Sequence, residues 1–500
     1  MNLKSVLIGI EGLKAKGNLD LEISSVECDF RTVKEGSLFV AIKGYEVDGH
    51  SFITKAIENG AKAIIFEEGA NYKEFMTNKD VTYIMAPNTR LAFALCSSNF
   101  FDNPSKKMKV IGITGTKGKT TTSFMIKRIL EKQGKKVGLI GTIAIYIGEQ
   151  KVKNSDRTTP ESNKIQEILD KMYKLGVEVV IMEVSSQSLK LDRVAGIEFY
   201  AGIFTNFSED HISEKEHATL EEYFESKMKL FNMCKYAFVN ADNLYTAKVP
   251  TLINNEKCKV ETYGIDNYCN FLAKDVTITN TYADFRAKIE TRNERIKVSI
   301  PGRFSVYNAL AAISVARLFG AKTETIKEAL EDIKVLGRSE LVDNKLDLKI
   351  MVDYAHTPDS LENILKTVKQ YTIGRVICVF GCGGDRDKHK RPIMGEISGR
   401  LADYTIITSD NPRNEIPEEI IETIENGTKK TKGNYECIID RKEAIKKAIY
   451  MANKNDMVII AGKGHEIYQE IQEEKLPFDE KEIIKEIIDE LEKQPKKKKK

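Results

Sequence analysis

The sequence predicts an α/β protein of three domains, and three observations support this fold class. The chain has 500 residues, more than one hydrophobic core usually spans, since domains are commonly about 150 residues long. Apolar residues make up 41% and charged residues 30% of the chain, as in ordinary globular proteins. Short apolar runs alternate with amphipathic helical patterns, which is typical of mainly parallel sheets. We therefore expect a small N-terminal α/β domain, a central parallel-sheet domain and a C-terminal Rossmann-like α/β domain.

The first expected domain covers residues 1–105. Apolar runs at residues 37–42 (SLFVAI) and 61–66 (AKAIIF) lie on either side of a helical pattern at residues 52–59, which indicates a small α/β arrangement. The polar segment SKKMK at residues 105–109 precedes an abrupt apolar run, so we place the first boundary there.

The second expected domain covers residues 106–336. The strand-like runs VEVVIM, AGIFTNF and YAFVNAD alternate with helical patterns in its first part. Residues 257–300 show period-two segments without a clear helix. We therefore expect an antiparallel insert in that stretch.

The third expected domain covers residues 337–500 and repeats the α/β rhythm. The runs KIMVDYA, RVICVFG, YTIITSD and MVIIAG are each followed by a glycine or a polar loop, and ligands of open parallel sheets collect at such strand ends. A last amphipathic helix should pack on this domain, because apolar residues recur at helical spacing: Ile483, Ile484, Ile487, Ile488 and Leu491. The lysines that end the chain are expected to form a solvated tail.

Charge, hydropathy and cysteine content exclude several classes of protein. Lys and Arg number 77 and Asp and Glu 74, which gives a net charge of +3; because the five terminal lysines outweigh this excess, the rest of the chain is slightly acidic. We expect no nucleic-acid partner.

No uncharged apolar stretch approaches the roughly 18 residues of a membrane span, so we expect a cytoplasmic protein without membrane insertion. The eight cysteines are scattered without a CxxC pair, and we expect free thiols.

A phosphate-binding loop is the strongest single motif. VIGITGTKGKTTT at residues 110–122 places a glycine turn between an apolar strand and a helix, the context that such a loop requires. Gly115 and Gly118 let backbone N–H groups converge on a polyphosphate, Lys119 reaches its outer phosphates, and Thr120 can offer a hydroxyl to Mg²⁺. The strict spacing would want glycine in place of Ile113, and a chance glycine turn is the alternative. We expect a P-loop ATPase domain in which ATP contacts Gly115, Thr116, Lys117, Gly118, Lys119, Thr120 and Thr121.

Two more side chains follow strands downstream of this loop. Glu183 comes directly after an apolar strand, and His211 follows the next one. A hard cation accepts a carboxylate, a loop hydroxyl and one imidazole when phosphate and water complete its shell. Each residue alone could be an ordinary loop residue. Together they predict a magnesium site with Thr120.

The chain resembles a known family over nearly all of its length. TGTKGKTTT, EVSSQSL, TNFSEDH, EYFESK, GRF followed by VYNALAA, DYAHTPD, GCGGDRDKHKRP, DNPRNE and GKGHE occur in this order and look like the motifs of the Mur ligases of cell-wall synthesis. The pattern is most similar to the branch that joins a diamino acid to UDP-N-acetylmuramoyl-L-alanyl-D-glutamate. The resemblance implies three domains that bind the UDP-sugar, ATP and the incoming amino acid respectively.

The resemblance also implies a reaction and the residues that perform it. ATP phosphorylates the substrate carboxylate, and the amine attacks the resulting acyl phosphate; Lys119, His211 and Arg338 would surround the phosphoryl group. Lys227 of EYFESK would be carbamylated by CO₂ and would bind a second Mg²⁺, which requires a lowered pKa. We expect a monomer. The residues carried over from matching motifs are Asp29, Arg31, Thr158, Thr159, Ser185 and Arg193 for the UDP-muramoyl-dipeptide, Asn308, Arg338, Asp353 and His356 for ATP, and Arg386, Asp410, Asn411, Arg413, Gly462 and Glu466 for the amino acid.

The identity of the diamino acid has two opposing cues. Arg413 of DNPR favours meso-diaminopimelate, because an arginine grips a carboxylate that lysine lacks at its far end. The segment between His211 and Lys227 is longer than in the common diaminopimelate-adding pattern and looks more like some lysine-adding members. L-Lysine or another diamino acid therefore stays an alternative. More distant alternatives are a ligase like folylpolyglutamate synthetase and a nucleotide switch without ligation.

Overall fold

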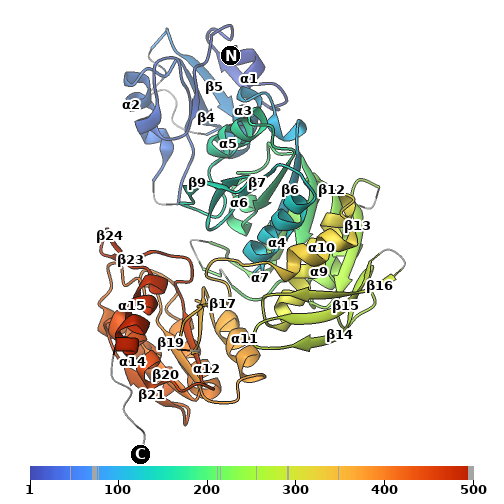
Figure 1. The fold of residues 1–500 in the computed structure, drawn as a ribbon. Helices are drawn as coiled ribbons and strands as arrows, with labels where there is room; N and C mark the ends of the chain where they lie inside the picture. The colour runs from blue at the N-terminus through green and yellow to red at the C-terminus, as the bar shows by residue number, and fades with distance from the viewer. Residues whose placement is uncertain are drawn as a thin grey trace, which may run out of the picture. The chain divides into compact units, whose positions relative to one another are not determined.

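The computed structural model describes residues 1–45, 47–69, 76, 78–210, 212–213, 216–254, 256–289, 292–346 and 348–493. Its chain is drawn in Figure 1. The chain divides into two compact units, which are Met1–Phe271 with Ala311–Thr325 and Leu272–Leu310 with Ile326–Lys500. We call them the first and second unit. The domain boundaries expected near residues 105 and 336 stay predictions.

The first unit begins with a five-stranded sheet in the order β1-β5-β4-β3-β2. Its strands pair in parallel except for β1, which is antiparallel to β5. The apolar runs expected at residues 37–42 and 61–66 are its buried strands β3 and β4. The bounds are β1 Lys14–Lys16, β2 Val26–Glu27, β3 Leu38–Val40, β4 Ala63–Glu67, β5 Thr82–Ala86, α1 Leu3–Val6, α2 Ile53–Glu58 and α3 Thr89–Phe100.

A larger sheet follows in the same unit. Its strands β13-β12-β11-β6-β10-β7 all pair in parallel, and β8 and β9 extend it in antiparallel fashion beyond β7. The bounds of the strands are β6 Lys109–Thr114, β7 Val137–Ile140, β8 Ala144–Ile147, β9 Gln150–Asn154, β10 Val179–Glu183, β11 Phe199–Phe204, β12 Cys234–Asn240 and β13 Lys259–Gly264. The helices are α4 Lys119–Lys132, α5 Ser162–Lys174, α6 Ser186–Lys190, α7 Leu220–Met228 and α8 Val249–Leu252.

Helix α4 shows why this part of the sequence folds as predicted. Met125, Ile126, Ile129 and Leu130 recur at helical spacing and are fully buried, and α4 packs against β6, β7 and β10. An apolar stripe of this kind stabilises a helix by tertiary burial, at about 25 cal/mol for each Å² removed from water. The strand, loop and helix expected at residues 110–122 are confirmed.

The second unit contains an antiparallel meander. β14 Phe271–Ile278, β15 Ala283–Ile289 and β16 Arg292–Val298 pair in sequence as antiparallel neighbours. This confirms the expected antiparallel insert for these strands. The expectation was wrong for β13, which pairs in parallel with β12, because strand direction depends on the partner rather than on the period-two pattern. Two helices follow in the chain, α9 Arg303–Leu318 and α10 Thr323–Glu331, of which residues 311–325 belong to the first unit.

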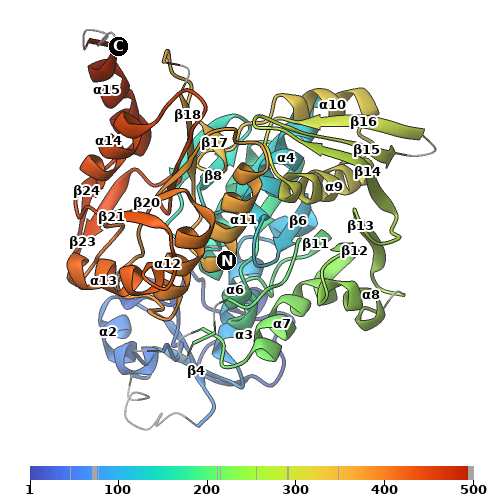
Figure 2. The same cartoon turned by 90° about the horizontal axis from the view of Figure 1, so that it is seen from below.

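A six-stranded sheet forms the rest of the second unit, in the order β17-β18-β22-β19-β20-β21. All pairs are parallel except β17 with β18. Helices α11, α12 and α13 share one core with the sheet and α14 and α15 another, so both faces are covered; Figure 2 shows α12 and α13 side by side. The bounds are β17 Glu340–Leu341, β18 Lys349–Asp353, β19 Val376–Phe380, β20 Tyr404–Ile407, β21 Asn434–Cys437, β22 Met457–Ala461, α11 Pro358–Lys369, α12 Lys390–Leu401, α13 Pro417–Thr428, α14 Arg441–Met451 and α15 Glu480–Lys493.

A separate hairpin precedes the last helix. β23 Tyr468–Ile471 and β24 Glu474–Pro477 pair with each other as antiparallel strands, and Ile471 also forms an isolated parallel bridge with Arg413. Ile483, Ile484, Ile487 and Ile488 of α15 are buried, which confirms the predicted packing of that helix. All eight cysteines carry free thiols, as expected. Within the described part of the chain, none of the helices has the length and apolar character needed to span a membrane.

Candidate functional site

The glycine loop between β6 and α4 has the conformation that its sequence predicts. Gly115 and Gly118 have φ angles of +139° and +84°, which favour glycine. A side chain at Gly115 would collide with Thr205 Oγ1. Thr205 Oγ1 donates to the carbonyl of Lys117 at 2.6 Å, and Lys117 N donates to Asn206 Oδ1 at 2.9 Å. The TNF segment after β11 therefore holds the loop in place.

Two lysine ammonium groups converge on this loop. Lys119 Nζ donates to the carbonyls of Gly115 and Thr116 at 2.8 and 3.1 Å. Lys227 Nζ, from α7, donates to the same Gly115 carbonyl at 3.1 Å. Positive charge is thus concentrated where a phosphate loop meets the outer phosphates of its nucleotide.

Lys227 is enclosed to an unusual degree for a lysine. Its side chain is 1% exposed, and its ammonium lies over the ring of Tyr223, 4.4 Å from the centroid. Burial holds the pKa of Lys227 well below its usual value of 10.5, and the charges of Lys119 and Lys117 lower it further against the opposing effect of Asp210. A lowered pKa increases the fraction of neutral, nucleophilic amine at neutral pH.

Glu183 ends β10 next to the first turn of α4. Its side chain is fully buried. Oε2 accepts hydrogen bonds from Thr120 Oγ1 and Thr142 Oγ1, both at 2.9 Å, and Oε1 accepts from Thr142 N at 3.0 Å. A carboxylate beside a phosphate-loop hydroxyl is a set of oxygen donors that suits a hard cation.

The predicted metal set is brought together in part. Thr120 and Glu183 are in direct contact, and Lys227 lies at the same loop. His211 lies outside the described residues. Among the residues that the structure describes, no group of three or more His, Cys, Asp and Glu side chains is placed to hold a metal.

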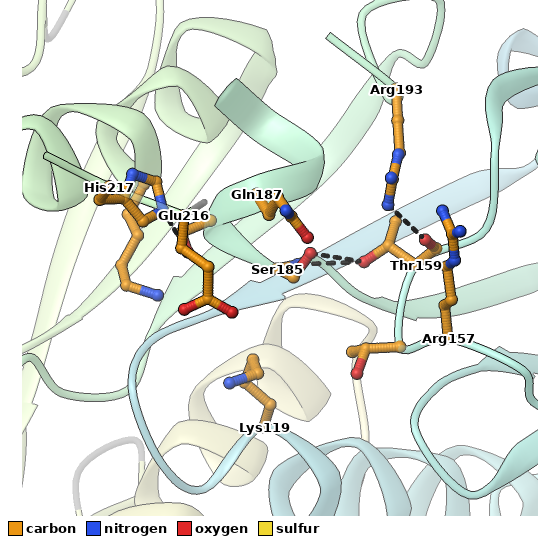
Figure 3. Close-up of a pocket in the computed structure, with 11 residues that line it drawn as sticks. Lys119, Arg157, Thr159, Ser185, Gln187, Arg193, Glu216 and His217 are labelled. Carbon is orange, nitrogen blue, oxygen red and sulfur yellow. Dashed lines mark hydrogen bonds between the residues drawn. The ribbon is translucent and has the colours of Figure 1, made fainter. Parts of the chain in front are cut away.

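A cavity of about 190 Å³ lies beside these groups (Figure 3). Thr159 Oγ1 donates to the carbonyl of Glu183 at 3.0 Å, and Ser185 N donates to Thr159 Oγ1 at 3.0 Å. Arg193 Nη1 donates to the carbonyl of Thr159 at 3.4 Å. The lining residues are Lys119, Arg157, Thr158, Thr159, Ser185, Ser186, Gln187, Arg193, Glu216, His217 and Lys227.

The cavity gathers four residues predicted for the muramoyl substrate and adds others that were not predicted. Arg157 adjoins the predicted Thr158 in the chain, and this adjacency is the one signal that could have found it. Glu216 and His217 lie in a loop without a motif. His217 is fully buried, and its Nε2 lies 3.0 Å from Ser186 Oγ.

Asp29 and Arg31 do not line this cavity. They flank Phe30 after β2, and the Arg31 guanidinium contacts the Asp29 carboxylate at 2.6 Å. This neighbour lowers the pKa of Asp29 through a side-chain hydrogen bond. Their expected contact with the uridine end stays a prediction.

A second cluster lies at the carboxyl ends of the six-stranded sheet, in the second unit. Asn411 Nδ2 donates to Glu466 Oε2 at 2.9 Å, and Lys463 Nζ donates to Asn411 Oδ1 at 2.7 Å. A side chain at Gly462, which has a φ of +118°, would lie 2.6 Å from Asp410 Oδ2. The residues predicted from DNPR and GKGHE are therefore neighbours, and the buried Lys463 joins them without having been predicted.

The two predicted arginines border the same glycine. A Cβ on Gly383 would lie 3.0 Å from Nη1 of Arg413 and 3.7 Å from the side chain of Arg386. Arg413 also contacts Glu470 at 2.9 Å, a residue that the motifs did not reveal because it lies on the β23–β24 hairpin.

The other residues expected at ATP also lie in the second unit. Ser339 N donates to Asp353 Oδ2 at 2.6 Å, and the Arg338 guanidinium lies 4.5 Å from the centroid of Tyr354. Burial raises the pKa of Asp353, opposed by the charge of Arg338. His356 Nδ1 lies 2.7 Å from the carbonyl of Tyr354, and Asn308 is buried on α9. Their contacts with ATP stay predictions.

Comparison with known families gives matches along most of the chain. The model described as "Mur ligase family, catalytic domain" matches residues 22–98. "Mur ligase middle domain" matches residues 113–316, and "Mur ligase, glutamate ligase domain" matches residues 337–464.

Individual proteins match over the full length. Proteins named UDP-N-acetylmuramoyl-L-alanyl-D-glutamate--2,6-diaminopimelate ligase from Caldanaerobacter subterraneus subsp. tengcongensis and Clostridium botulinum are each 46% identical over 494 residues. The alignments cover 99% and 98% of this chain and 100% of each relative. A solved structure of a ligase with the same name is 28% identical, with a TM-score of 0.69 and coverage of 99% of this chain and 100% of that one.

Proposed function

This chain belongs to the Mur ligase family, and we propose that it joins 2,6-diaminopimelate to UDP-N-acetylmuramoyl-L-alanyl-D-glutamate in an ATP-dependent reaction. Relatives that are 46% identical over nearly the whole chain carry this activity in their names. The reaction forms a C–N bond and belongs to peptidoglycan synthesis.

The observation that carries the proposal is the meeting of Lys119 and Lys227 at the Gly115 carbonyl. Both ammonium groups border the cavity that Thr158, Thr159, Ser185 and Arg193 also line. A phosphate loop beside a polar cavity of this composition can bring a triphosphate and an acceptor carboxylate together.

The chemistry requires an activated carboxylate, because a carboxylate anion does not expel oxide. An oxygen of the glutamate γ-carboxylate attacks the γ-phosphorus of ATP, and ADP leaves. The amine of the diamino acid then attacks the acyl carbon, the bond from that carbon to the phosphate oxygen breaks, and the nitrogen loses a proton. Lys119 supports the first of these two steps, because it holds positive charge beside the phosphoryl group while that group is transferred.

The residues present fit Mg²⁺. Glu183 is a buried carboxylate whose neighbours are threonine hydroxyls and a backbone amide, and such oxygen-rich sites suit hard cations. Thr120 and Glu183 would hold the ion, together with His211 by the family resemblance. When bound, Mg²⁺ supplies charge neutralisation for the phosphoryl group.

We extend the proposal to a carbamate on Lys227. The neutral amine attacks CO₂, an N–C bond forms, and the proton passes to solvent, which leaves an anionic side chain. The lowered pKa of Lys227 favours the neutral amine that this step needs. A carbamate would turn the enclosed amine into an anion able to hold a second Mg²⁺.

The second-unit cluster is the proposed site of the diamino acid. Asp410 and Glu466 supply carboxylates for an ammonium group, and Arg413 and Arg386 supply guanidinium groups for a carboxylate. The far end of meso-diaminopimelate carries both groups, whereas that of L-lysine carries the amine alone. This match favours diaminopimelate over lysine.

We also propose that the protein acts as a monomer in the cytoplasm. The cytoplasmic location is supported by the slightly acidic body of the chain, which offers no basic field to nucleic acid or to an anionic membrane surface. The monomer is carried over from the sequence analysis.

A ligation assay tests the proposed function. Purified protein is supplied with ATP, Mg²⁺, UDP-N-acetylmuramoyl-L-alanyl-D-glutamate and one of a panel of diamino acids, and phosphate release and amide product are both measured. We expect phosphate release that requires the nucleotide substrate and meso-diaminopimelate together. Preference for L-lysine would overturn the substrate assignment, and ATP hydrolysis indifferent to both co-substrates would indicate a nucleotide switch.

A further inference from the structure

The β23–β24 hairpin contacts the DNPR loop, residues 410–413, at three of its four positions. Gln469 Nε2 donates to the carbonyl of Asp410 at 2.7 Å, and Glu470 N donates to Asn411 Oδ1 at 2.9 Å. The Glu470 carboxylate contacts Arg413 Nε at 2.9 Å. The hairpin therefore adjoins the three side-chain positions of the loop that the proposed function assigns to the amino acid.

The backbone of Arg413 is held in an uncommon conformation. Its φ is +50°, in the left-handed region, where the backbone of a residue with a side chain is strained. Arg413 N donates to the carbonyl of Glu470 at 3.1 Å, and Gln472 N donates to the carbonyl of Arg413 at 2.8 Å. These two hydrogen bonds from the hairpin offset the backbone strain of Arg413.

The guanidinium group is fixed at two of its nitrogens. The Glu470 carboxylate forms an ion pair with Nε at 2.9 Å, and Arg413 Nη1 donates to the carbonyl of Gly384 at 2.9 Å. The absence of a side chain at Gly383 permits this approach, because a Cβ there would lie 3.0 Å from Nη1. One ion pair at Nε and one hydrogen bond from Nη1 thus hold a guanidinium that carries five N–H donors in a planar fork.

The pair is also largely shielded from solvent. The side chains of Arg413 and Glu470 are 19% and 25% exposed. An arginine held in one plane loses little side-chain entropy when it binds a carboxylate, since the freedom is already lost in the free protein.

We propose that Glu470 is a positioning residue for selection of the diamino acid. It sets the plane of the Arg413 guanidinium, and other N–H groups of that guanidinium then meet the distal carboxylate of the substrate. The inference rests on the proposed function, and it predicts that Glu470 acts on substrate selection only through Arg413.

A double-mutant cycle tests this coupling. The variants are Glu470→Ala, Arg413→Ala and the double variant, and KM and kcat are measured with meso-diaminopimelate, ATP and the UDP-linked substrate varied in turn. We expect Glu470→Ala to lower kcat/KM for diaminopimelate about tenfold when Arg413 is present and less than about twofold when it is absent. The KM values for ATP and the UDP-linked substrate should stay within about twofold of wild type in the Glu470→Ala protein.

Two further variants separate position from charge and from folding. Glu470→Gln keeps an oxygen acceptor for Nε, so it should recover part of the loss. Glu474→Ala changes an exposed glutamate on the other strand of the hairpin and should match wild type. Thermal unfolding of each variant shows whether the fold is intact.

The results can overturn this inference without affecting the proposed function. An equal cost of Glu470→Ala with and without Arg413 would contradict it, as would no cost at all in a folded protein. If the wild-type protein does not use diaminopimelate, the proposed function itself fails, and the unmodified protein reveals that before any variant is made.

Discussion

The chemistry of the Lys227 amine is determined by the residues that surround it. In sequence it is one lysine in EYFESKMKLF, and a solvated helix lysine would be the ordinary interpretation. In the structure it is fully enclosed, beside Lys119 and over the ring of Tyr223. Its lowered pKa is a consequence of that enclosure, and the proposed carbamate depends on it.

Lys227→Ala should retain ATP binding but lose ligation. The phosphate loop and Lys119 are unchanged, so the affinity for ATP should stay within about threefold of wild type, while turnover falls by about 10³-fold or more. Titration calorimetry and the ligation assay measure the two quantities. Lys229→Ala, which changes a half-exposed lysine two positions away, is the matched control.

Small carboxylates should restore part of the lost rate. Acetate or formate can occupy the space that Lys227→Ala leaves and supply the missing anionic oxygens. Full activity of this variant without any added carboxylate would refute the carbamate.

The lowered pKa of Lys227 predicts that the stability of the protein depends on pH. The unfolded chain protonates Lys227 below about pH 10.5, whereas the folded protein does so only at lower pH. Stability is therefore lost as the pH falls from about 10.5 toward the folded pKa, because the unfolded state binds more protons there.

Lys227→Met should relieve this cost in buffer free of CO₂. We expect its free energy of unfolding to exceed that of wild type by the order of 1–2 kcal/mol at pH 7, with the difference shrinking toward pH 10. Urea unfolding at several pH values measures it. The prediction fails if Lys227→Met is less stable than wild type at pH 7 and the difference in free energy of unfolding does not change with pH. That result would show that burial does not disfavour the Lys227 ammonium.

At the scale of elements, loops that follow parallel strands carry the site. The loop at residues 381–389 follows β19 and leads into α12, whose first turn contains Arg391, and the DNPRNE loop follows β20. Glu415 joins the two: Arg391 donates to both of its carboxylate oxygens at 2.9 Å, and Asp385 N donates at 2.7 Å. This bidentate arginine lowers the pKa of Glu415 to about 2.

Glu415→Gln should destabilise the protein in a pH-dependent way. The folded carboxyl titrates near 2 and the unfolded one near 4.5. The stabilisation is complete above about pH 4.5 and disappears as the pH falls toward 2. We expect the free energy of unfolding of Glu415→Gln to be about 2 kcal/mol lower than that of wild type at pH 7. This difference should become steadily smaller below pH 4.5.

Urea unfolding of the two proteins from pH 7 to pH 3 checks this. Glu418→Gln, at an exposed position in the first turn of α13, should change stability by no more than about 0.5 kcal/mol. A Glu415→Gln effect that does not vary with pH would mean that the ion pair is not its source.

The sequence predicts elements better than it predicts their partners. The spacing of apolar residues predicted β6 and α4, because each of these elements is determined by residues that are close together in the sequence. The direction of β13 was not predictable, since it depends on pairing with β12. Thr159 and Ser185 were predicted from motifs and do meet, whereas Glu216 and Glu470 reach their sites through loops that have no local pattern.

At the scale of the whole molecule, the proposed reaction draws on both compact units. The phosphate loop, Glu183 and Lys227 belong to the first unit, and the DNPR and GKGHE clusters belong to the second. The acyl phosphate formed at one set of residues must meet an amine held by the other.

Oxygen transfer tests the central claim most directly. The γ-carboxylate of UDP-N-acetylmuramoyl-L-alanyl-D-glutamate is labelled with ¹⁸O and consumed with ATP and meso-diaminopimelate, and the released phosphate is analysed by mass spectrometry. An acyl-phosphate route predicts one labelled oxygen in the inorganic phosphate for each amide formed. Unlabelled phosphate alongside amide product would contradict the account, because the carboxylate oxygen would then never have been bonded to phosphorus.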